Sequence, residues 1–169
     1  MSEKMDQSVF QEEDTQKGKF LNFILGNEHY GIEIKYVTEI IGIQEITEIP
    51  EVPEYIKGII NLRGKIIPVM DARLRFKKTT SQYNDRTCVI VIEVRGVSIG
   101  MIVDSVADVL AIPETEIVQP PTVGNGGNRF IKGIGKVENE VKLILDCNKL
   151  LNDEDTENLG NLTIIGGSK

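Results

Sequence analysis

Short runs of apolar residues, separated by glycine, proline and polar turns, recur along most of the chain. Runs of this length that are rich in isoleucine and valine and bounded by turn residues are typical of β-strands. The pattern predicts strands near 19–25, 29–34, 56–62, 65–70, 87–94, 97–103, 130–137 and 140–145. Many short strands of this kind indicate a mostly β protein built as a small barrel or sandwich.

Two stretches depart from the strand pattern. Between Lys35 and Gly42, the apolar residues Val37, Ile40 and Ile41 follow spacings of three and four, which predicts a short helix. The segment 146–151 predicts a second helix, capped at its start by an aspartate. The polar stretch 77–85 is expected to link two halves of the protein.

The chain repeats part of its own sequence. Shifted by 69 residues, the segment 31–43 lies over 100–112, with glycine, valine and isoleucine identical at three positions. An acid is retained as well, because Glu39 lies over Asp108. Self-similarity at a fixed shift indicates a duplicated structural unit.

A second match extends the repeat towards the end of the chain. Shifted by 75 residues, the segment 55–59 lies over 130–134. The difference of six residues (75 − 69 = 6) is an insertion between 113 and 129, where prolines and glycines predict an extended loop. The sequence therefore predicts two similar units, about 20–76 and 89–151, in one intimately packed structure.

The composition fits a strand-rich core and argues against binding to nucleic acid or to an anionic membrane. The chain is 40% hydrophobic but only 5% aromatic, without tryptophan. Its net charge is −7, of which the ends 1–17 and 152–169 carry −3 each, leaving −1 for the rest. Binding to phosphates needs a basic patch. No apolar run approaches the roughly 18 residues of a membrane-spanning helix, and the polar start lacks a signal-peptide core; we therefore expect a cytoplasmic protein.

Candidate catalytic and metal-binding groups are few. His29 is the only histidine and lies in a predicted turn, without the Cys or His partners that a histidine-based metal cluster needs. Cys88 and Cys147 are far apart in apolar surroundings, which is typical of buried thiols rather than of a redox pair. The glycine-rich loop 124–127 matches no nucleotide-binding motif. We expect no catalytic residue, no metal site and no cofactor.

The most informative segment contains Asn61-Leu62-Arg63-Gly64 between two predicted strands. Arg63 should project from a tight turn, where its guanidinium can reach a partner's carboxylate or backbone. The second unit has Glu138 at this position, so the duplication alone does not require an arginine. A solvated turn arginine and a partner-binding arginine stay open as alternatives at this point.

Several motifs together resemble the CheW family, in family order and spacing. They are Phe20-Leu21-x-Phe23-x-Leu25-Gly26, Tyr30-Gly31-Ile32-x-Ile34, Val37-x-Glu39-Ile40, Ile56-Lys57-Gly58, Asn61-Leu62-Arg63-Gly64, Pro68-x-x-Asp71 and Val103-Asp104-x-Val106-x-Asp108-Val109-Leu110. The resemblance implies a CheW-like domain over 18–151, made of two packed SH3-like, five-stranded β-barrels with one or two short helices. Whether strands are exchanged between the barrels is left open by the sequence.

The resemblance also implies a non-catalytic adaptor in bacterial chemotaxis signal transduction. Family members bind the helical cytoplasmic tip of methyl-accepting receptors in a groove between the barrels, and pair separately with the regulatory domain of the histidine kinase CheA. Such a groove fits an amphipathic helix whose register is fixed by a charge pair. Carried over by motif, the receptor-binding residues would be Val37, Glu39, Gly58, Arg63, Ile66, Cys88 and Val109, the first two on the predicted short helix.

The kinase contact is predicted at an exposed apolar stretch, Ile41-Gly42-Ile43. Near 118–123 the family often carries a charge and an aromatic residue for ring contacts in receptor arrays. Here Val118, Pro121 and Thr122 stand instead, so these residues do not predict a ring-forming surface.

Other interpretations are a CheV-like protein, a fragment of a CheA-like kinase, or a small-ligand-binding domain built on paired barrels. Neither an ATP-binding module nor a receiver domain fits outside 20–151, and a ligand-binding domain would need polar groups gathered in a pocket. We expect a monomer when free, located at receptor arrays, with disordered tails at 1–17 and 152–169, because these are polar and charged and have too few apolar residues to offset the entropy lost on ordering.

Overall fold

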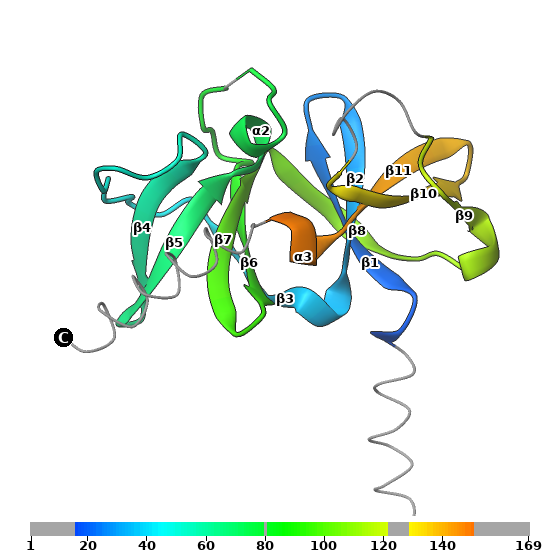
Figure 1. Ribbon diagram of the computed structural model, residues 1–169, viewed down its shortest axis with the longest axis horizontal. Helices are drawn as coiled ribbons and strands as arrows, with labels where there is room; N and C mark the ends of the chain where they lie inside the picture. Colours follow the sequence, from blue (N-terminus) through cyan, green and yellow to red (C-terminus); the bar gives the residue numbers. More distant parts are fainter. Residues whose placement is uncertain (1–15, 80, 122–128, 151–169) are drawn as a thin grey trace, which may run out of the picture.

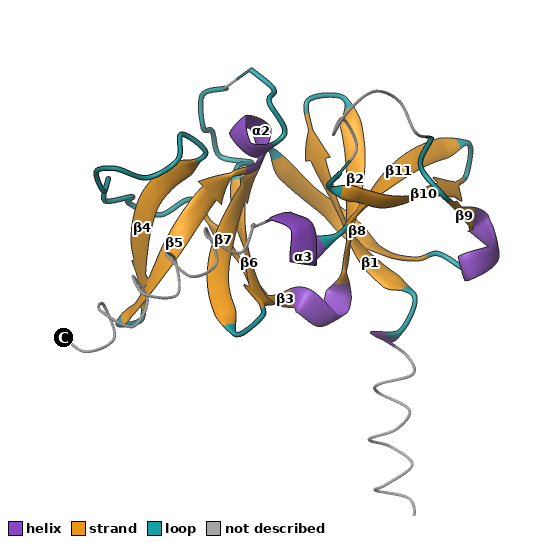
Figure 2. Ribbon diagram, viewed as in Figure 1, coloured by secondary structure: helices purple, strands orange, loops and turns teal. Residues whose placement is uncertain are grey.

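The computed structural model describes residues 16–79, 81–121 and 129–150. Within these ranges the chain is mostly β, and its short helices lie between strands or, in one case, after the last strand (Figure 2). Most of the tail 1–17, nearly all of the loop that contains 124–127, and the tail 152–169 lie outside the described residues.

The strands form two curled sheets, which lie side by side in Figure 1. Barrel 1 has the strand order β8 (Ser105–Ala111), β1 (Lys19–Leu25), β2 (Glu28–Glu33), β11 (Glu140–Leu145), β10 (Ile131–Val137) and the two-residue β9 (Ile117–Val118). Barrel 2 has the order β3 (Val37–Gly42), β6 (Cys88–Val94), β7 (Val97–Val103), β5 (Lys65–Asp71) and β4 (Ile56–Leu62). The connections include the helix α2 (Ala72–Arg75) and the 3-10 turns Ile34–Tyr36 and Glu114–Glu116, and the helix α3 (Cys147–Leu150) follows β11.

Each barrel takes strands from both sequence units. In barrel 1, β1 and β2 of the first unit join β8, β10 and β11 of the second, and β2 pairs with β11 in parallel. In barrel 2, β6 and β7 of the second unit join β3, β4 and β5 of the first, through the parallel pair β5–β7. Because the exchange is reciprocal, neither barrel can close without both units.

The strands predicted from the apolar runs are confirmed, with ends that agree to within one residue. The helix predicted at 146–151 is confirmed over Cys147–Leu150, and the Asp146 carboxylate accepts a hydrogen bond from the Asn148 backbone N–H at 3.0 Å. Asp71, the residue equivalent to Asp146 in the first unit, accepts from the Leu74 N–H at 3.3 Å and begins α2. The repeated aspartate therefore caps a short helix in each unit.

Two local predictions are wrong. The helix predicted from Lys35 to Gly42 is a single 3-10 turn over Ile34–Tyr36 followed by strand β3. Four of the six β3 residues are β-branched, and pairing with β6 alternates their exposure, so tertiary context overrides a spacing that fits either structure. His29, predicted in a turn, lies in β2 opposite Ile24.

The apolar core has three parts. The largest takes residues from both sheets, including Phe23, Ile90 and Met101, each 0% exposed, and joins the barrels to each other. A second cluster fills barrel 2, with Ile60, Ile67, Val69, Val89, Val91 and Ile102. The third fills part of barrel 1 and, among the described residues, has Phe20, Ile112 and Ile144 as its buried members. Burial of a large aliphatic side chain contributes roughly 1.5–3 kcal/mol, so the junction between the barrels is the main source of stability.

Candidate partner-binding surface

The β4–β5 hairpin presents Arg63 to solvent, as the sequence predicts. Arg63 and Gly64 have φ values of 53° and 88°, the positive values that a two-residue type I′ hairpin turn requires at both positions. The side-chain oxygen of Asn61 accepts a hydrogen bond from the Gly64 N–H at 2.8 Å and holds the turn. The Arg63 side chain is 70% exposed at this tip.

Arg63 forms an ion pair with Glu39, and this pairing was not predicted from the sequence. Nη2 of Arg63 lies 2.6 Å and 2.8 Å from the two carboxylate oxygens of Glu39. Glu39 lies on β3, so the helix assigned to Val37 and Glu39 is corrected to a strand, for the reason given above. The ion pair connects β3 to the β4–β5 turn. Because β3 and β4 are at opposite ends of the strand order in barrel 2, the pair links the two edges of this sheet.

The other predicted receptor-binding residues lie mainly on barrel 2. Ile66 is half-buried on β5, and Cys88, at the start of β6, is half-buried and pairs in register with Gly42. Val109 is 50% exposed but belongs to β8 of barrel 1. The structure therefore brings Glu39 and Arg63 into contact, and places Val109 on the other barrel.

Gly58 contributes to this surface through its backbone conformation, since it has no side chain that could contact a partner. Its φ is +147°, and a Cβ at this position would lie 2.1 Å from the carbonyl oxygen of Thr47. Thr47 and Ile59 exchange backbone hydrogen bonds of 2.9 Å next to it. Glycine is required here because any side chain would push the Thr47 segment away from β4.

The predicted kinase-binding stretch is only partly exposed. Ile41 is half-buried and packs against the apolar interior of barrel 2, and it lies on the same face of β3 as Glu39. Gly42 is exposed, and Ile43 is 36% exposed. Ile40, which precedes the predicted stretch, is 42% exposed on the opposite face of the strand. The exposed apolar residues of this segment are thus Ile40 and Ile43.

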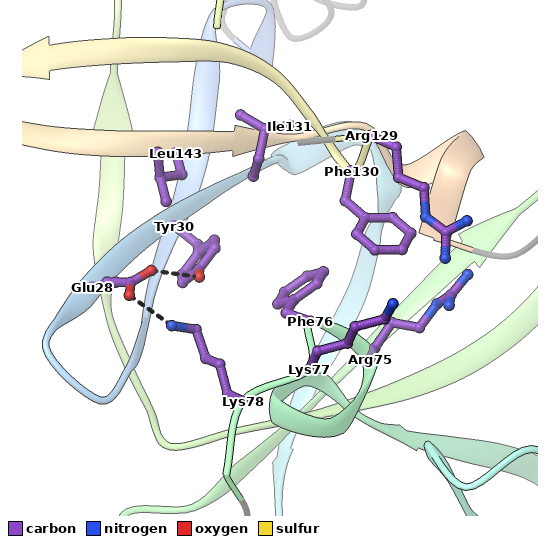
Figure 3. Close-up of a pocket in the computed structure, with 10 residues that line it drawn as sticks. All are labelled: Glu28, Tyr30, Arg75, Phe76, Lys77, Lys78, Arg129, Phe130, Ile131 and Leu143. Atoms are coloured by element: carbon purple, nitrogen blue, oxygen red, sulfur yellow. Dashed lines mark hydrogen bonds and ion pairs between the residues drawn. The ribbon is translucent and has the colours of Figure 1, made fainter. Parts of the chain in front are cut away.

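A groove of about 460 Å³ opens elsewhere, between the barrels. It is lined by Glu28, Tyr30, Arg75, Phe76, Lys77, Lys78, Arg129, Phe130, Ile131 and Leu143. Figure 3 shows the Tyr30 hydroxyl and the Lys78 ammonium both directed at the Glu28 carboxylate, at 2.8 Å and 2.6 Å. None of the predicted site residues lines this groove within the described chain.

Aromatic rings form the floor of this groove and connect the barrels. The rings of Tyr30 and Phe76 are stacked with their centroids 5.5 Å apart, and the centroids of the Phe76 and Phe130 rings are also 5.5 Å apart. Figure 3 shows the three rings along the groove. The Arg75 guanidinium lies over the rings of Phe130 and Tyr55 at 4.5 Å and 4.3 Å, and its Nε donates to the Leu150 carbonyl at 2.7 Å. The ring contacts and the Arg75 contacts hold α2, β2 and the residue before β10 together, so the Arg75 side chain that lines the groove already has a structural role.

The perturbed titratable groups are explained by local pairing and burial. Hydrogen bonds from Lys78 and Tyr30 lower the pKa of Glu28, and burial raises the pKa of Tyr30. Burial raises the pKa of Cys147 to about 12, so this thiol is neutral at physiological pH and unsuited to nucleophilic chemistry. Within the described residues, no group of three or more His, Cys, Asp and Glu side chains is placed to hold a metal ion.

Comparison with known proteins identifies the family. The model of the CheW-like domain matches residues 19–155. The chain is 36% identical over 143 residues to the chemotaxis protein CheW of Klebsiella aerogenes, covering 84% of this chain and 86% of that protein. It is 35% identical over 140 residues to CheW of Bacillus subtilis, covering 82% and 90%.

A solved structure agrees with this match. The scaffolding protein TtCheW from Thermoanaerobacter tengcongensis superimposes with a TM-score of 0.76 at 38% identity, covering 83% of this chain and 96% of that one. Among the described residues, no helix is long and apolar enough to cross a membrane. The chain therefore belongs to the CheW family of chemotaxis scaffold proteins, and its role is that of a non-catalytic adaptor.

Proposed function

We propose that this adaptor couples methyl-accepting chemoreceptors to the histidine kinase CheA in the bacterial cytoplasm, by binding both. Membership of the CheW family supports the proposal. The observation that carries it is the state of Arg63. Among the described residues, only Nη2 of Arg63 has a recorded partner, so its Nε and Nη1 donors stay available although the side chain is already held by Glu39.

A guanidinium held in this way is suited to recognise a carboxylate on a receptor helix. The Glu39 pair fixes the orientation of the side chain before binding, which lowers the entropy lost when a partner binds. The remaining donors can then form a second charge-assisted hydrogen bond. The charge contact at Arg63 would fix the register of the receptor helix.

The test is a binding assay with a soluble receptor signalling fragment and a CheA regulatory domain, each alone and both together. We expect complexes with each partner and a ternary complex. Arg63→Glu should weaken receptor binding by about tenfold or more, because it puts two acids at the contact, and should leave CheA binding unchanged. Lys136→Glu is the matched control, since it makes the same charge change at an exposed position on barrel 1.

A charge swap separates direct contact from a structural role. In Glu39→Arg with Arg63→Glu, the internal ion pair is restored with its polarity reversed. Direct recognition by Arg63 predicts that receptor binding stays weak in this double variant. Restored binding would show that the pair acts only as a structural tie, and failure of the unmodified chain to bind either partner at micromolar concentrations would refute the adaptor proposal.

A further inference from the structure

Equivalent ends of the two barrels differ sharply in chemistry. The repeat shifts hold in three dimensions, because Val69 pairs with Gly100 in barrel 2 and Ile144 pairs with Gly31 in barrel 1 (144 − 69 = 75; 100 − 31 = 69). We call the equivalent ends the barrel 2 mouth and the barrel 1 mouth. The barrel 2 mouth comprises Glu39, Arg63, Lys65, Ile67, Val91 and Ser98; the same positions in the barrel 1 mouth are Asp108, Glu138, Glu140, Lys142, Asn22 and His29.

The barrel 2 mouth is closed by apolar packing beneath paired polar groups. Ile67 and Val91 are 2% and 3% exposed and belong to the apolar interior of the barrel. Above them, Arg63 pairs with Glu39, and the Lys65 ammonium donates to the Ser98 hydroxyl at 3.1 Å. Every position of this mouth is therefore either apolar and buried or polar and paired.

The barrel 1 mouth buries polar groups instead. Lys142 is 3% exposed, and its Nζ donates to the Glu140 carboxylate at 2.6 Å and lies 3.3 Å from Nδ1 of His29. Asn22 is 4% exposed, and its Nδ2 donates to Asp108 at 3.2 Å. The side-chain oxygen of Asn22 is shielded from solvent and has no hydrogen-bond donor among the described residues.

The fold does not require these polar groups. Barrel 2 has valine and isoleucine at the positions of Asn22 and Lys142 and closes in the same way. A buried acceptor without a donor opposes folding, and so does a buried ammonium, even when it is paired. Their presence in one barrel alone indicates a role beyond packing.

These residues surround a hollow of about 350 Å³. Asn22, Asp108, Glu138, Glu140 and Lys142 are among the residues that line it. Three carboxylates against one ammonium give it a net charge of 1 − 3 = −2. Glu138 has no recorded partner among the described residues, and only one oxygen of Asp108 accepts a hydrogen bond. The hollow thus offers unused acceptors and negative charge.

We propose that the barrel 1 mouth binds the guanidinium of an arginine side chain on a protein partner. A guanidinium is planar, carries five donors in a fixed fork and is less strongly hydrated than an ammonium, so it suits a site with acceptors on several sides. Asp108 and Glu138 receive its charge at the rim, and Asn22 lies on the buried side with its free oxygen. The site is independent of Arg63, because it lies on the other barrel.

The proposal is tested by titrating the full, ¹⁵N-labelled chain with N-acetyl-L-arginine amide at low salt and following the NMR spectrum. The expected result is saturable shifts at the Asn22 side-chain amide and at the backbone of Asp108 and Glu138, with a dissociation constant on the order of 1–10 mM. N-acetyl-L-citrulline amide is the matched ligand, because it has nearly the same shape without the charge. Equal shifts with both ligands, or no saturable shift, would overturn the proposal.

Variants locate the site. Glu138→Arg introduces the residue found at the equivalent position in barrel 2 and should abolish saturation, while Asp108→Asn should weaken binding about fivefold or more. Glu93→Arg, an exposed acid on barrel 2, is the charge-matched control and should leave binding unchanged. Binding that survives Glu138→Arg would place the arginine elsewhere and refute the assignment.

Free L-arginine distinguishes a partner's side chain from a small-molecule ligand. Free L-arginine carries an α-ammonium and an α-carboxylate, which an arginine within a chain lacks, whereas the capped amide resembles arginine within a chain. A protein-borne arginine predicts that the capped amide binds more tightly than the free amino acid. The opposite order would show that the mouth is a metabolite site and would overturn the choice of partner.

Discussion

Barrel 2 and barrel 1 share a strand order, a hairpin geometry and a repeat relation, yet one has a closed apolar mouth and the other an open polar one. The equivalent hairpin tips have the same backbone, with positive φ at Arg63 and Gly64 and again at Glu138 and Asn139. The conformation of the turn therefore does not depend on the charge of its side chain. The duplication preserves the framework, and the residues at the mouths decide what each barrel can bind.

The difference also explains how the stability is distributed. Within the described part of the chain, six buried aliphatic residues fill barrel 2, whereas three buried apolar residues form the separate cluster in barrel 1. The polar mouth takes up positions that would otherwise extend that cluster. Much of the apolar burial of barrel 1 comes instead from its shared junction with barrel 2.

The largest effect is expected when the polar interior is transferred to barrel 2. Ile67→Lys places an ammonium in an apolar interior next to Lys65, without the acid and the histidine that accompany Lys142. We expect a loss of about 3–5 kcal/mol in the free energy of unfolding, measured by urea denaturation. A loss below about 1 kcal/mol would mean that the interior of barrel 2 is hydrated.

A smaller difference in stability is expected between alanine substitutions at equivalent glycines of the two barrels. A Cβ at Gly58 would meet the Thr47 backbone at 2.1 Å, whereas the close contact of a Cβ at the equivalent Gly133 would be with the Ile117 side chain at 2.7 Å, and the Val118 backbone oxygen would lie at an ordinary contact distance of 3.5 Å. Gly58→Ala should therefore cost about 3 kcal/mol and Gly133→Ala about 1 kcal/mol, because a side chain moves more easily than backbone.

The matched control for these glycine variants is Gly42→Ala, since nothing lies within 4 Å of a Cβ there. Thermal unfolding of the three variants gives the order of stability. Equal losses at Gly58 and Gly133 would remove the distinction between the barrels at this position.

The double variant Asn22→Val with Lys142→Ile makes the opposite change to Ile67→Lys. It gives the barrel 1 mouth the two apolar residues that barrel 2 has at these positions. Replacement of a buried pair by apolar residues of similar volume is often stabilising, so we expect a gain of about 1–2 kcal/mol in the free energy of unfolding. The same variant should no longer bind the capped arginine. A loss of stability would show that the polar mouth is part of the folding core.

The smallest effect concerns an ion pair present at only one junction. Arg73 donates to Asp104 through Nε at 2.8 Å and through Nη2, and the positions equivalent to Arg73 and Asp104 hold Asn148 and Lys35. The hydrogen bonds from Arg73, aided by the Gly26 N–H, lower the pKa of Asp104 in the folded state. The stabilisation is present above the ordinary pKa of an aspartate and is lost as the pH falls through the lowered value.

Asp104→Asn should therefore reduce stability by about 1 kcal/mol or less at pH 7. The difference from the unmodified chain should shrink towards pH 3, because the carboxylate of the unfolded chain, whose pKa is ordinary, is then largely protonated. Urea denaturation at both pH values checks this expectation. A difference that is constant with pH would attribute the effect to packing instead of charge.

Much of the fold could be predicted from the sequence, because strands in barrels are short and their apolar runs end at turn residues. β3 and β8 were not predicted. In both, the burial of each residue is set by a partner strand from the other unit, so the sequence of the segment alone fits more than one structure. Val37, Ile40 and Ile41 show this, since their spacing fits a helix until β6 lies beside them.

The candidate sites were predicted to different degrees. The turn at Arg63 followed from Asn61 and Gly64, which favour positive φ and local side-chain capping. The contact of Arg63 with Glu39 was not predicted. The repeat does contain a signal for it, in the alignment of Glu39 with Asp108 and of Arg63 with Glu138. In barrel 2 the two positions hold opposite charges, and in barrel 1 they hold like charges.

The sequence alone determined the duplication, the positions of eight of the strands, the exposed turn arginine and the resemblance to an adaptor family, because each depends on local pattern or on motifs in fixed order. The tertiary structure decided which strands share a barrel, which face of β3 is exposed, and that Asn22, Lys142, Asp108 and Glu138 meet at one mouth. These features depend on pairing between residues far apart in the chain, and that pairing is fixed only when both units fold together.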